Sequence, residues 1–272
     1  MINSIETYIV DSFTDKPFKG NPAGVCILKS KLQDQQMLSI AKELGLSETA
    51  FVTKTDLLNT YNIPFFSPKM EIPPCEHATL ASSKVLFEKD TSLTKIHFIN
   101  SQNLDLIIKR DGKNILMKFP VYDTKPQEVP RELLNALGLN KVIASVFNEE
   151  TEILLLEIED SQVLANLTPD FESLKHSHKA INGVLVTAIS KQTNYDFESR
   201  YFWPWSGINE DPVTGATHTF LAKYWSKQLN KTKMNSYQCS ERTGFMEVEL
   251  ISNEKLIIKS MAQIILKGEL TI

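Results

Sequence analysis

The stretches Phe65-Phe66-Ser67-Pro68 and Tyr201-Phe202-Trp203-Pro204 share the pattern aromatic-aromatic-x-Pro and lie half a chain length apart in this 272-residue sequence. Both are followed by a glutamate, a proline and the start of a helical segment: Glu71, Pro74 and His77-Ala78-Thr79, and Glu210, Pro212 and Gly215-Ala216-Thr217. The pattern predicts an internal duplication into two similar lobes, each a sheet that carries one central helix. Four loosely matched positions can also arise by chance, which is the alternative reading.

Hydrophobic periodicity predicts three main helices along the chain. Residues 33–44 place apolar side chains on one face and are followed by Gly45, a residue typical of the position after a helix end. Residues 78–87 and 216–229 form the other two, and each follows one copy of the repeated pattern. Two shorter helices are predicted at residues 130–137 and 170–174.

Short apolar segments bounded by Gly, Pro, Asp or Asn predict many strands. They lie at residues 8–10, 24–28, 50–53, 95–99, 104–109, 115–119, 144–147, 153–158, 184–188, 245–250, 256–259 and 264–266. The fold class is therefore α/β (α+β), with two pseudo-symmetric lobes that each wrap a mixed or antiparallel sheet around a helix.

The segment Pro120–Pro130 holds three prolines and several polar residues, which indicates a boundary between lobes. The expected N-terminal lobe spans residues 1–120, with the C-terminal strand 262–272 as an optional addition to it. The expected C-terminal lobe spans residues 121–272.

Composition excludes several classes of protein. A hydrophobic content of 42% and a charged content of 23% are typical of globular proteins. The formal net charge is -4 and basic residues are scattered, so we expect no nucleic-acid partner. The longest apolar runs are too short to cross a bilayer, and residues 1–6 lack the pattern of a signal peptide, so we expect no membrane partner.

Three widely spaced cysteines, Cys26, Cys75 and Cys239, cannot form a disulfide framework. They indicate a reduced, cytoplasmic protein. The sequence contains no Cys-x-x-Cys or His-x-x-x-His pair for zinc and no glycine-rich phosphate loop. We therefore expect no metal and no cofactor, with the chemistry carried by side chains alone.

The starts of the two repeated helices suggest where that chemistry occurs. Exposed backbone N–H groups and the helix dipole make a helix N-terminus a site for an anion. Two such ends facing one cleft would hold a carboxylate and leave the adjacent carbon between side chains of both lobes. This arrangement suits proton abstraction, which needs a general base and an acid.

Four sequence blocks resemble successive signatures of the PhzF-like isomerases, the phenazine biosynthesis-like family. They are Gly20-Asn21-Pro22-Ala23-Gly24-Val25, Leu46-Ser47-Glu48-Thr49-Ala50-Phe51, His77-Ala78-Thr79-Leu80-Ala81 and Glu210-Asp211-Pro212-Val213-Thr214-Gly215, with a fainter match at Gln238, Arg242 and Gly244. The blocks follow the family order, so the resemblance covers essentially the whole chain.

The resemblance implies a diaminopimelate-epimerase-like fold with the active site in the cleft between two lobes and no metal or organic cofactor. Glu48 matches the acid/base carboxylate, and Asp211 and His77 match its assisting catalytic residues. Asn21 and the helix-start residues Gly215 and Ala216 match positions beside the substrate. The implied partner is a small carboxylate-bearing metabolite, and a homodimer is expected because related proteins are often dimers.

Each of these residues has a simpler structural interpretation. Glu48 could be a solvated loop carboxylate, since exposed glutamates are the rule. Asp211 could set a turn before Pro212, and His77 could bond the backbone at a helix start. Cys75 beside His77 could suggest a thiol enzyme, but a nucleophile and its base rarely stand two residues apart and usually meet through the fold.

Three positions depart from the family pattern. Glu76 stands where a glycine is usual before the helix histidine, Ala216 where a serine is usual, and Pro64 where an arginine is frequent. Glu76 adds bulk and negative charge where the family receives a carboxylate, so we treat it as a substrate-binding position. The departures concern the substrate class more than the fold.

The sequence therefore favours a cofactor-independent isomerase or epimerase that moves a proton on a small carboxylic acid. The alternative is a non-catalytic small-ligand-binding paralogue in which Glu76 modifies the anion site. We expect Glu48, His77 and Asp211 to line the cleft between the lobes. Because burial disfavours a charged carboxylate, we also expect Glu48 to be largely buried with a raised pKa.

Overall fold

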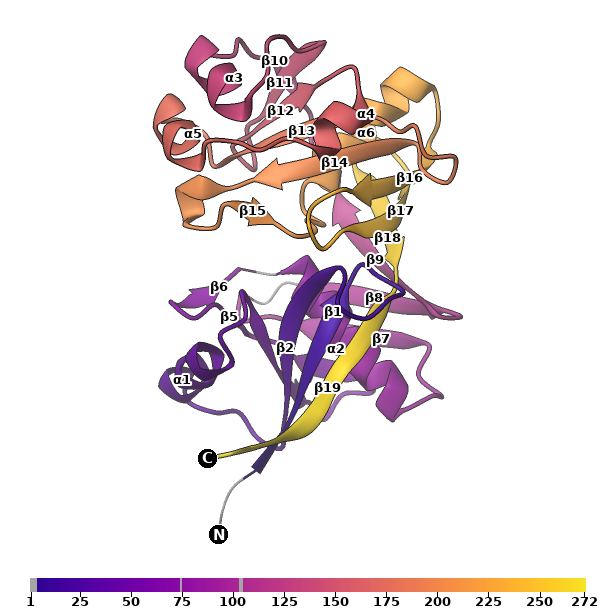
Figure 1. Ribbon diagram of the computed structural model, residues 1–272. Helices are drawn as coiled ribbons and strands as arrows, with labels where there is room; N and C mark the ends of the chain where they lie inside the picture. Colours follow the sequence, from indigo (N-terminus) through magenta and orange to yellow (C-terminus); the bar gives the residue numbers. More distant parts are fainter. Residues whose placement is uncertain (1–3, 74, 103–104) are drawn as a thin grey trace. The chain divides into compact units, whose positions relative to one another are not determined.

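The computed structural model describes residues 4–73, 75–102 and 105–272, and the chain divides into two compact units. Unit 1 combines Met1–Lys118 with Ile258–Ile272, and unit 2 is Phe119–Ile257 (Figure 1). The chain leaves unit 1 within β9 (Asn114–Pro120) and returns to it within β18 (Lys255–Ser260). Pro74 of the repeated pattern and residue 104 of one expected strand lie outside the described residues.

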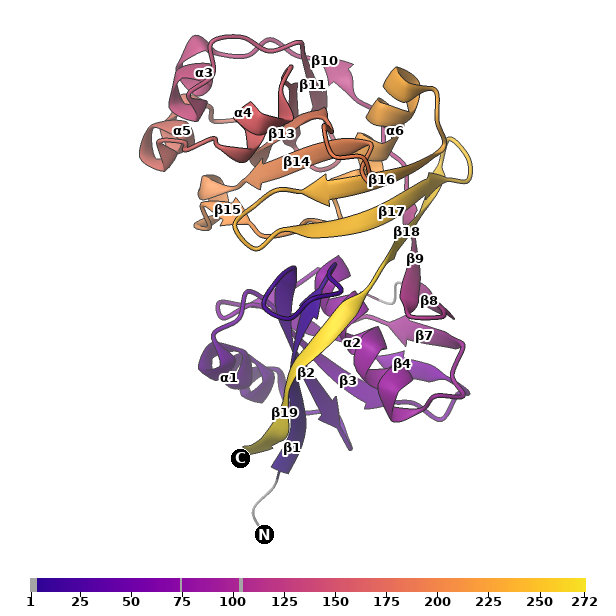
Figure 2. The same cartoon turned by 45° about the vertical axis from the view of Figure 1, so that its right-hand side comes forward.

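The sheet of unit 1 is built around its N-terminal strand. β1 (Ser4–Ser12) pairs antiparallel with β2 (Asn21–Leu28) on one side and with the C-terminal β19 (Ala262–Thr271) on the other, as Figure 2 shows. β2 then runs parallel to β3 (Thr49–Lys54). The remaining strands are β4 (Thr60–Asn62), β5 (Phe65–Phe66), β6 (Glu71–Ile72), β7 (Lys95–Ile99) and β8 (Asp105–Asp111).

The central helix of unit 1 is α2 (Glu76–Lys89), which contacts β1, β2, β3 and β19. Most of its side chains are buried, including the hydroxyls of Ser82 and Ser83, which donate to the carbonyls of Ala78 and Thr79. A helix that is buried on nearly every face needs apolar side chains, or polar side chains that are hydrogen-bonded. The sequence of α2 meets that condition.

The crossover between β2 and β3 is made by α1 (Asp34–Leu44), which buries Met37, Ile40 and Ala41. The helix ends at Gly45, whose φ of 66° lies in the left-handed region that favours glycine. The chain then turns back through Glu48 into β3.

Unit 2 has a mixed sheet centred on β13 (Gly183–Ile189). This strand runs parallel to β12 (Ile153–Glu157) and antiparallel to β14 (Phe197–Phe202). The sheet continues through β16 (Lys233–Gln238) and β17 (Gly244–Leu250) at one side and through β11 (Ala144–Asn148) and β10 (Lys125–Pro126) at the other. The smaller helices are α3 (Arg131–Leu137), α4 (Ser161–Ala165) and α5 (Phe171–Ser177), and η1 (Pro204–Ser206) is a single 3-10 turn.

The central helix of unit 2 is α6 (His218–Leu229). Its Trp225 stacks on Phe197 of β14 and donates from Nε1 to Thr187 Oγ1 of β13 at 2.9 Å. A buried indole N–H needs such a partner. The helix therefore packs against the sheet much as the central helix does in unit 1.

The repeated sequence pattern corresponds to a repeated local structure. In unit 1 the aromatic pair forms β5 and bends back onto β6, where Phe66 faces Glu71. In unit 2 the aromatic pair ends β14 and bends back onto β15 (Glu210–Asp211), where Phe202 faces Glu210. Both hairpins precede the central helix, so the duplicated two-lobe architecture expected from the sequence is confirmed.

Helix boundaries differ from the expected ones. α2 starts at Glu76 instead of residue 78, which places His77 within its first turn. α6 starts at His218 instead of residue 216, because Gly215 and Ala216 accept i+3 bonds from His218 and Thr219 in a tighter turn. The short α4 was not predicted from the sequence. In the described part of the chain no helix has the length and apolar character needed to cross a membrane.

Candidate active site

Glu48 is held at the start of β3 by the parallel pairing of β2 and β3. The backbone carbonyl of Glu48 accepts a hydrogen bond from the N–H of Gly24 at 3.0 Å. Gly24 faces Thr49 across the strands, and a Cβ added to Gly24 would lie 2.8 Å from Thr49 Oγ1. The glycine therefore permits the close approach that fixes Glu48, whose side chain is only 16% exposed.

His77 meets Glu48 from the first turn of α2. Its Nε2 lies 2.7 Å from Glu48 Oε2, and the imidazole is 10% exposed. The backbone carbonyl of His77 accepts a hydrogen bond from Ser12 Oγ at 2.6 Å, which ties the start of the helix to the end of β1. Three separate elements therefore fix one buried carboxylate–imidazole pair.

The charges of the pair stabilise each other. Burial alone would lower the pKa of His77, but its contacts with Cys75 and with the Glu48 carboxylate raise that pKa well above 6.5. Burial raises the pKa of Glu48, but the His77 imidazolium outweighs it and holds the pKa below 4.5. The side chain of Glu48 is largely buried as expected, whereas the expectation of a raised pKa is wrong because it took no account of His77.

Cys75 completes the group around His77. Its Sγ lies 3.2 Å from His77 Nδ1 and 3.9 Å from Nε2, so the sulfur lies against the side of the ring nearer to Nδ1. The thiol is partly exposed, and burial together with the charges of Glu48 and Glu76 raises its pKa to about 11. A spacing of two residues argues against a nucleophile and its base, yet the helix start brings both side chains into contact.

Among the described residues, Glu48, Cys75 and His77 are the group whose donor atoms lie within 4.8 Å of one another, and their types are those that bind zinc. The carboxylate occupies Nε2 of the imidazole, while the sulfur lies nearer to Nδ1. The three side chains therefore form an ion pair with a thiol beside it. Their donor atoms contact one another and do not converge on one position that a metal ion could occupy.

Asn21 and Glu76 lie close to this pair in unit 1. Asn21 is the first residue of β2, is buried, and faces Ser12 across β1. Glu76 is the first residue of α2 and is partly buried. Its negative charge reaches Cys75, whose pKa it raises.

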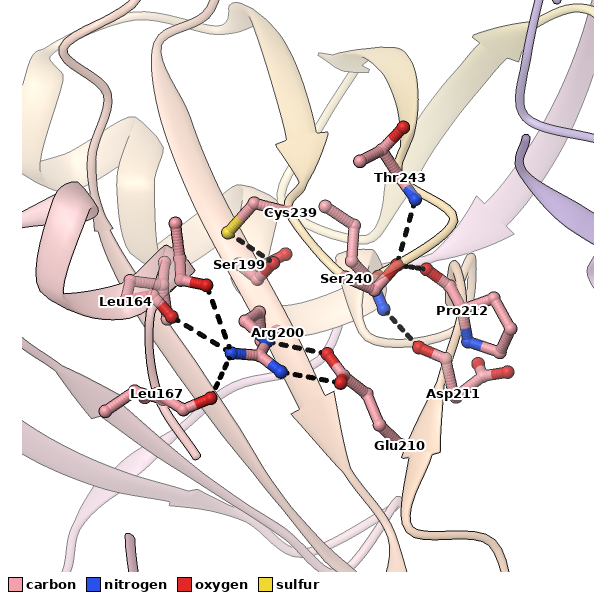
Figure 3. Close-up of polar contacts among 12 residues, drawn as sticks. Leu164, Leu167, Ser199, Arg200, Glu210, Asp211, Pro212, Cys239, Ser240 and Thr243 are labelled. Atoms are coloured by element: carbon pink, nitrogen blue, oxygen red, sulfur yellow. Dashed lines mark hydrogen bonds and ion pairs between the residues drawn. The ribbon is translucent and has the colours of Figure 1, made fainter. Parts of the chain in front are cut away.

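Asp211 lies in unit 2, at the end of β15 and before α6. Its carboxylate accepts from Thr214 Oγ1, and its backbone carbonyl accepts from Gln238 Nε2 at 2.7 Å. Gln238 Oε1 accepts in turn from the N–H of Thr214 at 2.9 Å. Nearby, Ser240 Oγ donates to the carbonyl of Pro212 (Figure 3).

A buried arginine fixes the strand that carries Asp211. Arg200 binds Glu210 in a bidentate pair, with Nε to Oε1 and Nη2 to Oε2 both at 2.7 Å (Figure 3). Arg200 Nη1 also donates to the carbonyl of Leu167 at 2.7 Å. A bidentate pair fixes the relative orientation of the two side chains as well as pairing their charges, so it orients β15 against β14. Sequence reasoning missed this pair because its members lie on different strands.

Gly215 and Ala216 form the tight turn that leads into α6. This turn is held by His218, which is buried and whose pKa burial lowers to about 4. A neutral His218 donates from Nδ1 to the carbonyl of Thr214 at 3.0 Å, so its Nε2 accepts from Ser236 Oγ at 2.7 Å. The sequence offered no signal that distinguished this histidine.

Comparison with known proteins identifies the family. The profile described as phenazine biosynthesis-like protein, PhzC-PhzF, matches residues 10–268. The chain belongs to this family.

Relatives of this PhzF-family protein match it over nearly their full length. An uncharacterized isomerase of Pseudomonas aeruginosa is 39% identical over 96% of both chains, and a phenazine biosynthesis-like domain-containing protein of Mus musculus is 39% identical over 97% of this chain and 98% of its own. A PhzF-family crystal structure from Enterococcus faecalis has 36% identity and a TM-score of 0.92, covering 99% of this chain and 100% of that one. These relatives support an isomerase-type enzyme.

More distant structures share the fold. A hydroxyproline epimerase from Agrobacterium vitis superposes with a TM-score of 0.60 at 8% identity, covering 99% of this chain and 93% of that one. The PhzF-family protein described here therefore has the expected epimerase-like fold. Within it, unit 1 brings together Glu48 and His77 with Cys75, and unit 2 carries Asp211, Gly215 and Ala216.

Proposed function

We propose that this protein is a cofactor-independent isomerase or epimerase that moves a proton on a carbon of a small carboxylate-bearing metabolite, with Glu48 as the principal acid/base. The observation that carries the proposal is the 2.7 Å pair of Glu48 Oε2 and His77 Nε2 in largely buried surroundings. A carboxylate and an imidazole in contact supply one base and one acid, which proton transfer at carbon requires.

The charge state of the pair suits the first half of such a reaction. The lowered pKa of Glu48 keeps its carboxylate ionised and ready to accept a proton at neutral pH. The raised pKa of His77 keeps the imidazolium charged beside it. That positive charge and the N-terminus of α2 would both stabilise negative charge that develops on a substrate.

When Glu48 takes a proton from carbon, its negative charge disappears next to the imidazolium. The pKa of His77 then falls, because Glu48 is one of the groups that raise it. A proton on Glu48 and an acidic imidazolium together favour return of a proton to the substrate. The pair therefore supports both removal and delivery of a proton.

We assign assisting roles to residues of both units. Asp211 is proposed as the second carboxylate of the reaction, held by Thr214 and Gln238. Asn21, Gly215 and Ala216 are proposed to bind substrate. The cleft expected between the lobes, the homodimer and the cytoplasmic location stay predictions.

The competing proposal is a small-ligand-binding protein without catalysis, in which Glu76 repels a carboxylate. Two like charges in contact near a protein surface repel by about 4 kcal/mol. The partly buried position of Glu76 at the start of α2 is the observation that favours this alternative.

The test is hydrogen–deuterium exchange at carbon in D₂O, followed by NMR, with proline, trans-4-hydroxy-L-proline and methylitaconate as first probes. We expect exchange with the wild type that disappears in Glu48→Gln. The matched control is Glu43→Gln, which removes an exposed carboxylate of α1. Exchange that appears only in Glu76→Gly would show that Glu76 prevents the protein from acting on such acids. Binding without exchange in every variant would favour the ligand-binding alternative.

A further inference from the structure

The hairpin that precedes the central helix is repeated in the two units, with Glu210 and Glu71 at the same register of its second strand. In unit 2 its first strand carries Arg200, two residues before the phenylalanine that faces Glu210. In unit 1 the residue two positions before the phenylalanine that faces Glu71 is Pro64. Unit 1 therefore has the glutamate of this pair without the arginine.

In unit 2 the guanidinium of Arg200 fills the space beside this hairpin. It binds both carboxylate oxygens of Glu210 at 2.7 Å and also donates to the carbonyls of Leu164 and Leu167 (Figure 3). Both leucines belong to the crossover between the parallel strands β12 and β13. Only 10% of the arginine side chain is exposed. The guanidinium thus joins the glutamate of the hairpin to the crossover segment.

Unit 1 has a cavity of about 340 Å³ at the corresponding place. It is lined by the crossover between the parallel strands β2 and β3, which includes the start of α1, and by residues of the hairpin. The lining residues that matter for recognition are Lys31, Asp34, Asn62, Pro64 and Glu71. A proline side chain is shorter than that of arginine and carries no charge, so the space beside the glutamate stays open in unit 1.

The charges around the cavity favour a cation. Glu71 is partly buried, and it forms no ion pair with any residue that the structure describes. Asp34 and Lys31 also line the cavity and are exposed. Two carboxylates and one ammonium group leave one negative charge over. Because a partly buried carboxylate is more stable with a cationic partner than without one, a ligand that brings a positive charge to Glu71 is favoured.

We propose that this cavity binds the guanidinium group of a small molecule, which pairs with Glu71 as Arg200 pairs with Glu210. A guanidinium is planar, and its forked N–H donors fit both oxygens of a carboxylate. The volume lies within the range of about 300 to 1,000 Å³ that is typical of small-molecule sites. The inference goes beyond the proposed function and does not depend on it, because neither Glu48 nor His77 lines the cavity.

The first test titrates L-arginine, L-citrulline and L-lysine into the wild type and follows the backbone amides by ¹⁵N NMR. L-Citrulline has the shape of arginine with a neutral urea group, and L-lysine has a cation without the fork. We expect L-arginine to shift the amides of the lining residues and to bind roughly tenfold or more tightly than either control compound. Equal binding of a control compound, no binding of L-arginine, or shifts confined to the surroundings of Glu48 would overturn the inference.

The second test changes the protein and keeps L-arginine as the probe. Glu71→Gln should weaken binding by roughly 10- to 100-fold, the usual range for lost hydrogen bonds to a charged group, whereas Glu43→Gln removes an exposed carboxylate outside the lining and should bind like the wild type. Pro64→Arg supplies the missing guanidinium from the chain itself and should abolish binding, whereas Pro64→Ala leaves the cavity open and should retain it. Wild-type affinity in Glu71→Gln, or in folded Pro64→Arg, contradicts the assignment of the site.

Discussion

Replacing His77 by glutamine should destabilise the protein in a pH-dependent way, because it removes the imidazolium that lies 2.7 Å from Glu48. Glutamine retains a polar side chain of similar length but carries no charge. Glu48 then lacks the positive charge that lowers its pKa, so burial, which raises that pKa, becomes the dominant influence. Glu48 should therefore titrate above 4.5 in the variant and below 4.5 in the wild type.

The size of the effect follows from burial of the pair. Both side chains are less than one fifth exposed, so screening by solvent is weak. Removing one partner of a buried ion pair typically costs about 3 to 5 kcal/mol, and each unit of pKa shift corresponds to about 1.4 kcal/mol. We expect His77→Gln to lower the unfolding free energy by about 3 kcal/mol, at the lower end of this range, because an unpaired Glu48 can take up a proton instead of staying charged.

The sign of the pH dependence follows from the two shifts. The folded-state pKa of His77 is raised, so its contribution is complete below 6.5 and is lost as pH rises through the folded pKa. The folded-state pKa of Glu48 is lowered, so its contribution is complete above 4.5 and is lost as pH falls through the folded pKa. The difference in unfolding free energy between wild type and variant should therefore be largest between pH 4.5 and 6.5.

Urea denaturation at several pH values measures this difference, and the double variant with Glu48→Gln measures the coupling of the two residues. The double variant should lose less stability than the two single variants together. A His77→Gln variant that loses less than about 0.5 kcal/mol at pH 5.5, or a strictly additive double variant, would refute the reasoning, since surface changes alone stay within that range.

Two further predictions concern residues that position the candidate site. Arg200→Met should lower the unfolding free energy measured in urea by about 3 to 5 kcal/mol, because it leaves Glu210 buried without its bidentate partner. The control Glu159→Gln, in an exposed ion pair, should change the unfolding free energy by less than about 1 kcal/mol. Equal effects of the two variants would contradict the argument from burial. Gly24→Ala should lower the unfolding free energy by about 1 to 3 kcal/mol and reduce exchange activity, because the new Cβ would lie 2.8 Å from Thr49 Oγ1, beside Glu48. A variant as stable and active as the wild type would show that this strand can move.

Much of the fold could be predicted from the sequence because its signals are local. The repeated aromatic pair with a following glutamate produces the same hairpin twice, at Phe66 with Glu71 and at Phe202 with Glu210. α2 begins two residues before its predicted start, because a helix buried on nearly every face has no polar side to mark its limits. α6 begins two residues after its predicted start, because Gly215 begins a 3-10 turn that hydrophobic periodicity does not reveal.

The candidate site was harder to predict because it depends on contacts between distant elements. Glu48 and His77 were identified only through the resemblance to the family, and neither residue type alone marks a site. The direction of the Glu48 pKa shift depends on the position of His77, which only the packing of α2 against β3 supplies. The closeness of Cys75 to His77 in sequence argues against a nucleophile–base pair, although a helix start can bring such side chains together.

The central claim is that Glu48 moves a proton at carbon, and the most direct measurement is mass-spectrometric counting of deuterium in a substrate acid incubated in D₂O with wild type, Glu48→Gln or Glu43→Gln. The account predicts incorporation of solvent deuterium at one carbon position with wild type and with Glu43→Gln, and a loss of roughly 10²-fold or more with Glu48→Gln. Incorporation by Glu48→Gln at the wild-type rate would contradict it.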